Sequence, residues 1–61
     1  NINPRLAEAY YNRGVLYYYR GEWGREKAIR DLRQAAELSR QQRNAALYEA
    51  VMELLRELGA V

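Results

Sequence analysis

The chain has 61 residues, and its ten basic and eight acidic side chains leave a net charge of +2. Cysteine and histidine are both absent, which excludes a disulfide framework and a zinc site built from those residues. We therefore expect one small domain over residues 1–61 that depends on packing or self-association for its stability. A chain of this size buries only roughly 60% of the surface that it exposes when unfolded.

The first predicted helix spans residues 4–20. Asn3 can cap its free backbone amides, and Pro4 suits the first helical position because its φ is already fixed near the helical value. Gly21 is expected to end this helix, since glycine adopts the left-handed conformation of a helix C-terminus at little cost.

Two further helices are predicted, over residues 26–42 and 45–58. Small and apolar residues recur at helical spacing in both of them, and Asn44 can cap the third helix. The predicted fold class is therefore all-α, an antiparallel helix hairpin followed by a third, capping helix.

Tyrosines of the first helix fall on two neighbouring faces. Tyr10, Gly14 and Tyr17 recur at i, i+4 and i+7 and so share one face. We expect this face to pack against Ala28 and Leu32 of the second helix, with the glycine allowing close approach. A second ring-rich face lies about 100° further round the helix axis.

The stretch AEAYYNRGVLYYYRGEW, residues 7–23, carries this tyrosine and glycine spacing and resembles the tetratricopeptide repeat (TPR) family. The family's second-helix positions are matched by Ala28, Leu32 and Ala35. The resemblance covers nearly the whole chain. It implies about one and a half repeats of an α-solenoid, that is, a piece of an array with one full repeat and a capping helix.

Three features depart from the family pattern. Arg13 stands where leucine is preferred and Arg40 where the closing proline would be, and we interpret both as surface changes. The turn between the first two helices is two residues too long, and removal of Gly24 and Arg25 would restore the usual spacing. Such an insertion either bulges the loop or loosens the hairpin enough for domain swapping.

The resemblance implies that the second ring-rich face of the first helix lines a concave groove. The candidate partner-binding residues are Tyr11, Asn12, Val15, Tyr18 and Tyr19. Tyrosine suits a peptide groove because its rigid ring buries area while its hydroxyl can bond a backbone carbonyl. The expected function is a protein-protein interaction or scaffold module that binds a protein or peptide. The alternative for this face is contact with a neighbouring repeat or another copy.

A second apolar stripe on the third helix predicts self-association, most simply as a homodimer. Its residues are Tyr48, Met52 and Leu55, which lie about 90° from the inner face of that helix. The alternative to a peptide-binding module is therefore an engineered repeat protein whose main partner is itself, with domain swapping through the Gly24-Arg25 turn as one route.

No chemistry is predicted for this chain. It has no glycine-rich phosphate loop, and its single serine, Ser39, has no candidate base nearby in the helix. We therefore expect no enzyme activity, no cofactor, no catalytic residue and no metal site.

Charge and hydropathy bear on the remaining partner classes. Arginines cluster in the middle of the chain, but acidic residues interleave with them, which favours salt bridges over nucleic-acid binding. No apolar run approaches the roughly 18 residues of a membrane span, so no membrane partner is expected. The absence of cysteine is consistent with the cytoplasm but fits an engineered protein equally well, which leaves the location unknown.

Overall fold

The computed structural model describes residues 4–60 of the chain. In chain order, its elements are α1 (Pro4–Tyr18), the 3-10 helix η1 (Gly21–Gly24), α2 (Arg25–Gln41) and α3 (Ala45–Glu57). The described residues include no strand, so the predicted all-α class is confirmed. Asn3, the predicted cap of the first helix, lies outside them.

The helix limits differ from the predicted ones by one or two residues. α1 ends at Tyr18 because the Arg20 amide donates to the Tyr17 carbonyl oxygen at 3.0 Å, which tightens the last turn. α2 begins and ends one residue earlier than predicted, and α3 also ends one residue earlier. Gly21 follows α1 with φ 71°, in the left-handed conformation expected of it.

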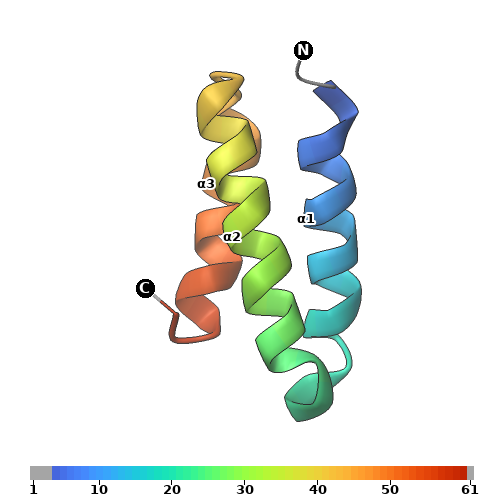
Figure 1. The fold of residues 1–61 in the computed structure, drawn as a ribbon. Helices are drawn as coiled ribbons and strands as arrows, with labels where there is room; N and C mark the ends of the chain where they lie inside the picture. The colour runs from blue at the N-terminus through green and yellow to red at the C-terminus, as the bar shows by residue number, and fades with distance from the viewer. Residues whose placement is uncertain (1–3, 61) are drawn as a thin grey trace.

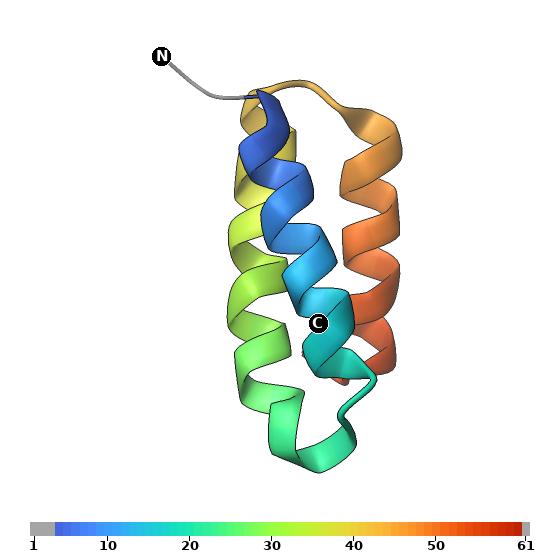
Figure 2. The same ribbon diagram turned by 90° about the vertical axis from the view of Figure 1, so that its right-hand side faces the viewer.

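The helices run alternately down, up and down, with α2 between the other two (Figure 1). α2 packs against both α1 and α3. The view turned by 90° separates α1 from α3 and shows that these two helices run in the same direction (Figure 2). The Cα atoms span 34 × 18 × 13 Å, so the molecule is too thin for a second core layer and each helix keeps one side towards solvent.

The core lies along α2, where it faces α1 on one side and α3 on the other. Its buried cluster consists of Leu32, Ala35, Ala36, Val51 and Leu55. A Cβ atom added to Gly14 would lie 2.8 Å from both Cγ and Cδ2 of Leu32. The predicted close approach of the first two helices at Gly14 is therefore confirmed.

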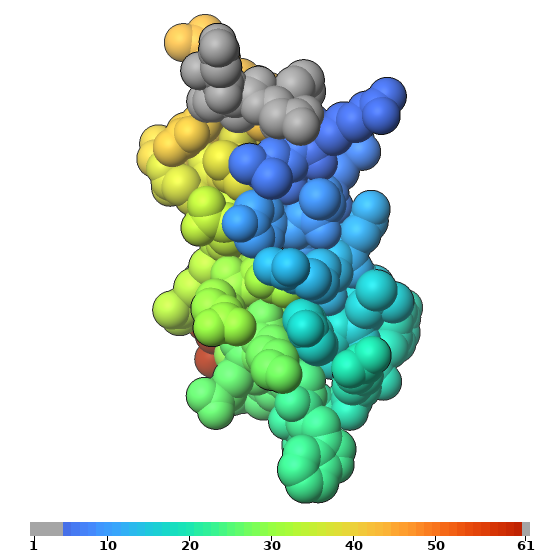
Figure 3. Space-filling view, turned by 45° about the vertical axis from the view of Figure 1, so that its right-hand side comes forward, coloured from blue at the N-terminus to red at the C-terminus, as the bar shows by residue number. Residues whose placement is uncertain are grey.

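The turn between α1 and α2 is compact. Residues Gly21–Gly24 form η1, which makes the lower tip of the molecule (Figure 3). Gly24 is buried, and a Cβ atom on it would overlap the carbonyl oxygen of Tyr17 and lie 2.9 Å from its carbonyl carbon. The turn can fold back against the end of α1 because this position carries no side chain.

Both ends of α3 are capped. The Asn44 Oδ1 atom accepts a hydrogen bond from the Leu47 amide at 3.2 Å, which confirms the predicted N-terminal cap. At the other end the Gly59 amide donates to the Arg56 carbonyl (3.0 Å) and the Ala60 amide to the Leu55 carbonyl (2.9 Å). With Gly59 at φ 73°, this paired arrangement reverses the chain and brings Ala60 back towards α2.

Candidate interaction surfaces

The predicted partner-binding face of α1 divides into a packed part and an exposed part. Tyr11 is half-buried and packs against the core cluster. Val15 and Tyr18 are also half-buried, whereas Asn12 is exposed. Tyr19 is exposed as well, with 78% of its surface accessible. The described structure therefore leaves Asn12 and Tyr19 fully available to a partner and gives Tyr11 a packing role as well.

Tyr18 is held in place by the third helix. Its hydroxyl donates to the Glu57 Oε1 atom at 2.6 Å, across 39 positions of sequence. The Tyr19 ring meets the Tyr18 ring edge-on, with centroids 5.5 Å apart and an interplanar angle of 69°. An anchored ring thus supports an exposed one, an arrangement that sequence spacing within α1 could not indicate.

A recess adjoins this tyrosine pair at the end of the helix bundle. Its volume is about 560 Å³, and it is lined by Tyr18, Tyr19, Gly21, Glu22, Arg25 and Leu58. The Arg25 Nη2 atom donates to the Leu58 carbonyl oxygen at 2.6 Å. The recess therefore contains aromatic faces together with a cation and a carboxylate.

Gly24 and Arg25, the predicted insertion, both have defined packing roles. Gly24 closes the turn onto Tyr17, and Arg25 is the first residue of α2 and reaches the C-terminal carbonyl of α3. In the described chain Gly24 lets the turn fold back on α1, and Arg25 joins the start of α2 to the end of α3. Its status as an insertion relative to TPR repeats, and any part in domain swapping, stay predictions.

The hydrogen bond to Glu57 raises the pKa of Tyr18 above its usual value of 10.0. The folded protein holds this proton more tightly than the unfolded chain, so the resulting stabilisation is complete below pH 10 and is lost as pH rises through the raised pKa. We expect the stability advantage of the parent chain over Tyr18→Phe to shrink in this alkaline range. Urea unfolding of both proteins at increasing pH measures it.

A phenolate absorbance titration of the same two proteins gives the signal of Tyr18 alone by subtraction. We expect this difference curve to have its midpoint above 10.0, the usual tyrosine pKa. A midpoint at or below that value would contradict the bond between Tyr18 and Glu57.

Tyr10 and Tyr17, predicted to be core residues, differ in their surroundings. Tyr10 is half-buried and packs against the core cluster. Tyr17 is half-buried but is not among the residues packed against that cluster, and its ring lies 5.6 Å from both the Arg20 guanidinium and the Lys27 amine. Tyr17 therefore lies at the edge of the hairpin, where cation–π contacts replace much of the expected burial.

An ion pair between α1 and α2 was missed by the sequence prediction. The Arg13 Nε and Nη2 atoms donate to the two carboxylate oxygens of Asp31 at 2.8 and 3.1 Å. Asp31 is buried at 4% exposure, while the Arg13 side chain is about half exposed. The pair raises the pKa of Arg13 and supplies the buried carboxylate with both hydrogen-bond donors. Arg13 is a packing residue here and not a neutral surface change.

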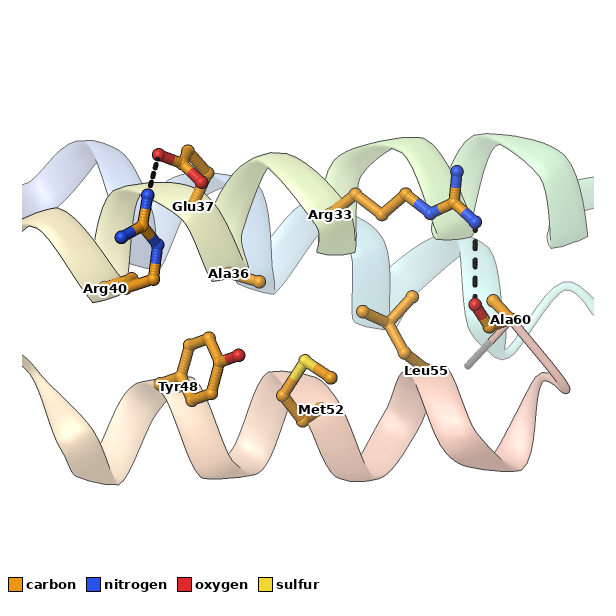
Figure 4. Close-up of a pocket in the computed structure, with 8 residues that line it drawn as sticks. All are labelled: Arg33, Ala36, Glu37, Arg40, Tyr48, Met52, Leu55 and Ala60. Atoms are coloured by element: carbon orange, nitrogen blue, oxygen red, sulfur yellow. Dashed lines mark hydrogen bonds and ion pairs between the residues drawn. The ribbon is translucent and has the colours of Figure 1, made fainter.

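A groove between α2 and α3 contains the predicted self-association stripe (Figure 4). Its volume is about 260 Å³, and its lining residues are Arg33, Ala36, Glu37, Arg40, Tyr48, Met52, Leu55 and Ala60. Tyr48 and Met52 are half-buried. The prediction that Leu55 is open to a partner is wrong, because Leu55 is only 3% exposed and belongs to the core cluster. It forms the floor of the groove, against α2 and beneath the reversed C-terminal residues.

Charged residues of α2 flank this groove. Arg40 donates to the Glu37 carboxylate at 2.7 Å, and Gln41 donates to the same oxygen at 3.0 Å, which lowers the pKa of Glu37. Arg33 makes a longer contact of 3.5 Å with the Ala60 carbonyl oxygen. Several arginines of the predicted cluster thus contact groups within the protein.

Residues 4–60 contain neither a metal-binding cluster nor a membrane-spanning helix. No group of three or more acidic side chains in this part of the chain is placed to hold a metal ion. None of its helices is long and apolar enough to cross a membrane.

No protein-family model matches the chain, and no curated protein or solved structure is significantly similar to it. The resemblance to TPR repeats therefore rests on the residues of the sequence.

Proposed function

We propose that this chain is a protein-interaction module without chemistry of its own, which binds a protein or peptide segment through α1 and the adjoining recess. The observation that supports this function best is the Tyr18–Tyr19 pair, in which an anchored ring supports a ring that is 78% exposed. Exposed aromatic rings that are already held in position are typical anchors of protein interfaces, because little conformational entropy is lost when they bind.

The recess gives the tyrosine pair a place to hold a peptide. Its volume is about 560 Å³ and it is wide open to solvent, which suits a segment that lies across the surface better than an enclosed small molecule. Rigid tyrosine rings bury contact area at low conformational entropy cost. Arg25 offers donors and Glu22 offers acceptors on the recess wall, which matches the carbonyl and amide groups of a peptide backbone.

Selection of binders from a phage-displayed library of random peptides tests this proposal. We expect Tyr19→Ala to weaken binding of the selected peptides at least about tenfold, as for an aromatic anchor at an interface, with little change in thermal midpoint because the ring is exposed. The matched control is Trp23→Ala, since Trp23 is 93% exposed and outside the recess lining.

Two results would contradict the proposal. One is that the library yields no peptide that binds the folded chain. The other is that Trp23→Ala weakens binding as much as Tyr19→Ala does, which would place the contact surface on η1 and away from the tyrosine pair.

A further inference from the structure

The groove between α2 and α3 has an apolar floor and an α2 wall that carries two arginines and one glutamate, Arg33, Arg40 and Glu37, with Glu37 bonded to Arg40. Ala36 and Leu55 are buried at its base, and half-buried Met52 lies beside them. Arg33 and Arg40 project from α2 along the upper edge in Figure 4. The α3 residues that line this groove carry no charge.

The outer edge of α3 carries two glutamates and one arginine, since Arg56 follows Glu53 by three positions and Glu49 by seven and so shares their face. Glu49 and Glu53 directly follow Tyr48 and Met52, and each successive residue is turned about 100° round a helix. Val51, which precedes Met52, points into the core and is buried. The residues that follow Tyr48 and Met52 lie on the opposite side of the stripe, away from the core, and both glutamates are exposed. No hydrogen bond or ion pair within residues 4–60 engages either of them.

We propose that the α2–α3 groove is a homodimer interface, in which the arginine wall of one copy packs against the glutamate edge of the other. The α2 side has one more positive than negative side chain and the α3 edge has one more negative than positive, so the surface is complementary to itself across its apolar centre. A two-fold axis parallel to the groove exchanges the sides and places each α2 against α3 of the partner. The occupant is therefore a second copy of this chain, and the interface is separate from the tyrosine recess.

Helix direction is compatible with this arrangement. α2 and α3 run in opposite directions within one chain (Figure 1). Rotation about an axis parallel to the groove keeps each helix direction, so α2 of one copy meets α3 of the other antiparallel. Antiparallel neighbours bring the positive end of one helix dipole close to the negative end of the other.

Two neighbouring recesses share residues with the groove and extend the candidate interface beyond it. A second recess shares Arg33 and is lined by Glu26, Ile29, Arg30, Arg33 and Gln34. A third shares Arg40 and Tyr48 and is lined by Ser39, Arg40, Arg43, Asn44, Ala45 and Tyr48. A stable interface buries about 800 Å² per partner. That area is about a sixth of the 4542 Å² accessible surface of this chain.

Charge reversal tests the interface. Sedimentation equilibrium of the parent chain is expected to show a species of twice the 7.2 kDa chain mass. Arg33→Glu with Arg40→Glu places acids opposite the partner's glutamates, and we expect it to raise the dissociation constant about a hundredfold because like charges at an interface are strongly unfavourable. Glu49→Arg with Glu53→Arg is expected to do the same. An equimolar mixture of these two variants is expected to recover the dimer. In the mixed dimer the acidic α2 side of one variant faces the basic α3 edge of the other, and the two unchanged sides also have opposite charge.

The matched control is Arg20→Glu with Lys27→Glu, which makes the same change of charge beside Tyr17 and outside the groove. We expect this control to dimerise like the parent, and circular dichroism to show that all variants are folded. A parent chain that stays monomeric would overturn the proposal. A dimer that survives both charge reversals would also overturn it, and this is the result expected if the copies exchange helices. So would a mixture of the two variants that fails to form a dimer. Loss of the dimer on Tyr19→Ala would place the contact at the tyrosine recess and overturn it as well.

Discussion

Replacing Gly24 with alanine is expected to lower the free energy of unfolding by about 3 kcal/mol, the upper end of the usual cost of overpacking. The added Cβ atom would overlap the Tyr17 carbonyl oxygen and lie 2.9 and 3.0 Å from the carbonyl carbon and Cα of the same residue. All three atoms are backbone, so no rotamer change can relieve the overlap. A domain of this size has roughly 3–9 kcal/mol of stability in total, so the loss is severe.

Two other glycines provide the controls, each measured by urea unfolding. At Gly14 the new Cβ atom would press on the Leu32 side chain, which is fully buried and can shift only if the core repacks, and alanine's better helix propensity offsets part of that cost. At Gly21 there is no atom within 4 Å, and the cost is the left-handed φ of 71°. We expect Gly21→Ala to lose about 1 kcal/mol and Gly14→Ala to lose about 1 to 2 kcal/mol. A Gly24→Ala loss no larger than theirs would show that the turn does not press against Tyr17.

Replacing Arg13 with methionine is expected to lower the thermal midpoint by about 10 °C or more. Methionine keeps much of the aliphatic stem but removes both hydrogen bonds to Asp31, a residue that is 4% exposed and whose carboxylate would be left without a partner. A buried charge that has lost its partner costs far more than the exposed pair between Arg40 and Glu37 is worth. Differential scanning calorimetry measures the change.

Two variants show whether burial is the cause. Arg13→Met combined with Asp31→Leu removes both charges, and we expect it to recover most of the lost midpoint. Arg40→Met breaks the exposed pair and is expected to shift the midpoint by no more than a few degrees. If Arg13→Met and Arg40→Met had equal effects, the Asp31 carboxylate would not depend on Arg13.

Features encoded within one helix or at its ends could be predicted from the sequence. Asn44 caps α3, Gly21 follows α1 in a left-handed conformation, and Gly14 lies against Leu32. Each depends on residues close in sequence or on one repeating face of a helix. Such signals survive without knowledge of how the helices are arranged.

Features that depend on where helices meet were missed or misplaced. The bond from Tyr18 to Glu57 joins residues 39 apart, and the pair of Arg13 with Asp31 joins residues 18 apart. Leu55 was assigned to an outer stripe because the helical spacing places it near Met52. The rotation of α3 against α2 determines which member of that stripe is buried, and the pattern of α3 alone does not contain this rotation.

The turn between α1 and α2 shows the same limit of prediction from sequence. In the sequence, Gly24 and Arg25 stand out only because they make the turn two residues longer than in TPR repeats, and this extra length predicts a bulged or loosened hairpin. A count of residues cannot show that Gly24 lies under the Tyr17 carbonyl or that Arg25 reaches Leu58. Both contacts become apparent only in the three-dimensional structure.

Two side chains from the hairpin end of the molecule reach the last turn of α3, with Tyr18 bonded to Glu57 and Arg25 to Leu58. In a simple stack of repeats a terminal helix is held only by its neighbour and can detach alone. Here the end of α3 is bonded to both arms of the hairpin, so fraying of α3 and opening of the turn are coupled. The recess beside Tyr19 exists only while all three helices are docked, and a ligand bound there would stabilise the whole domain through mass action.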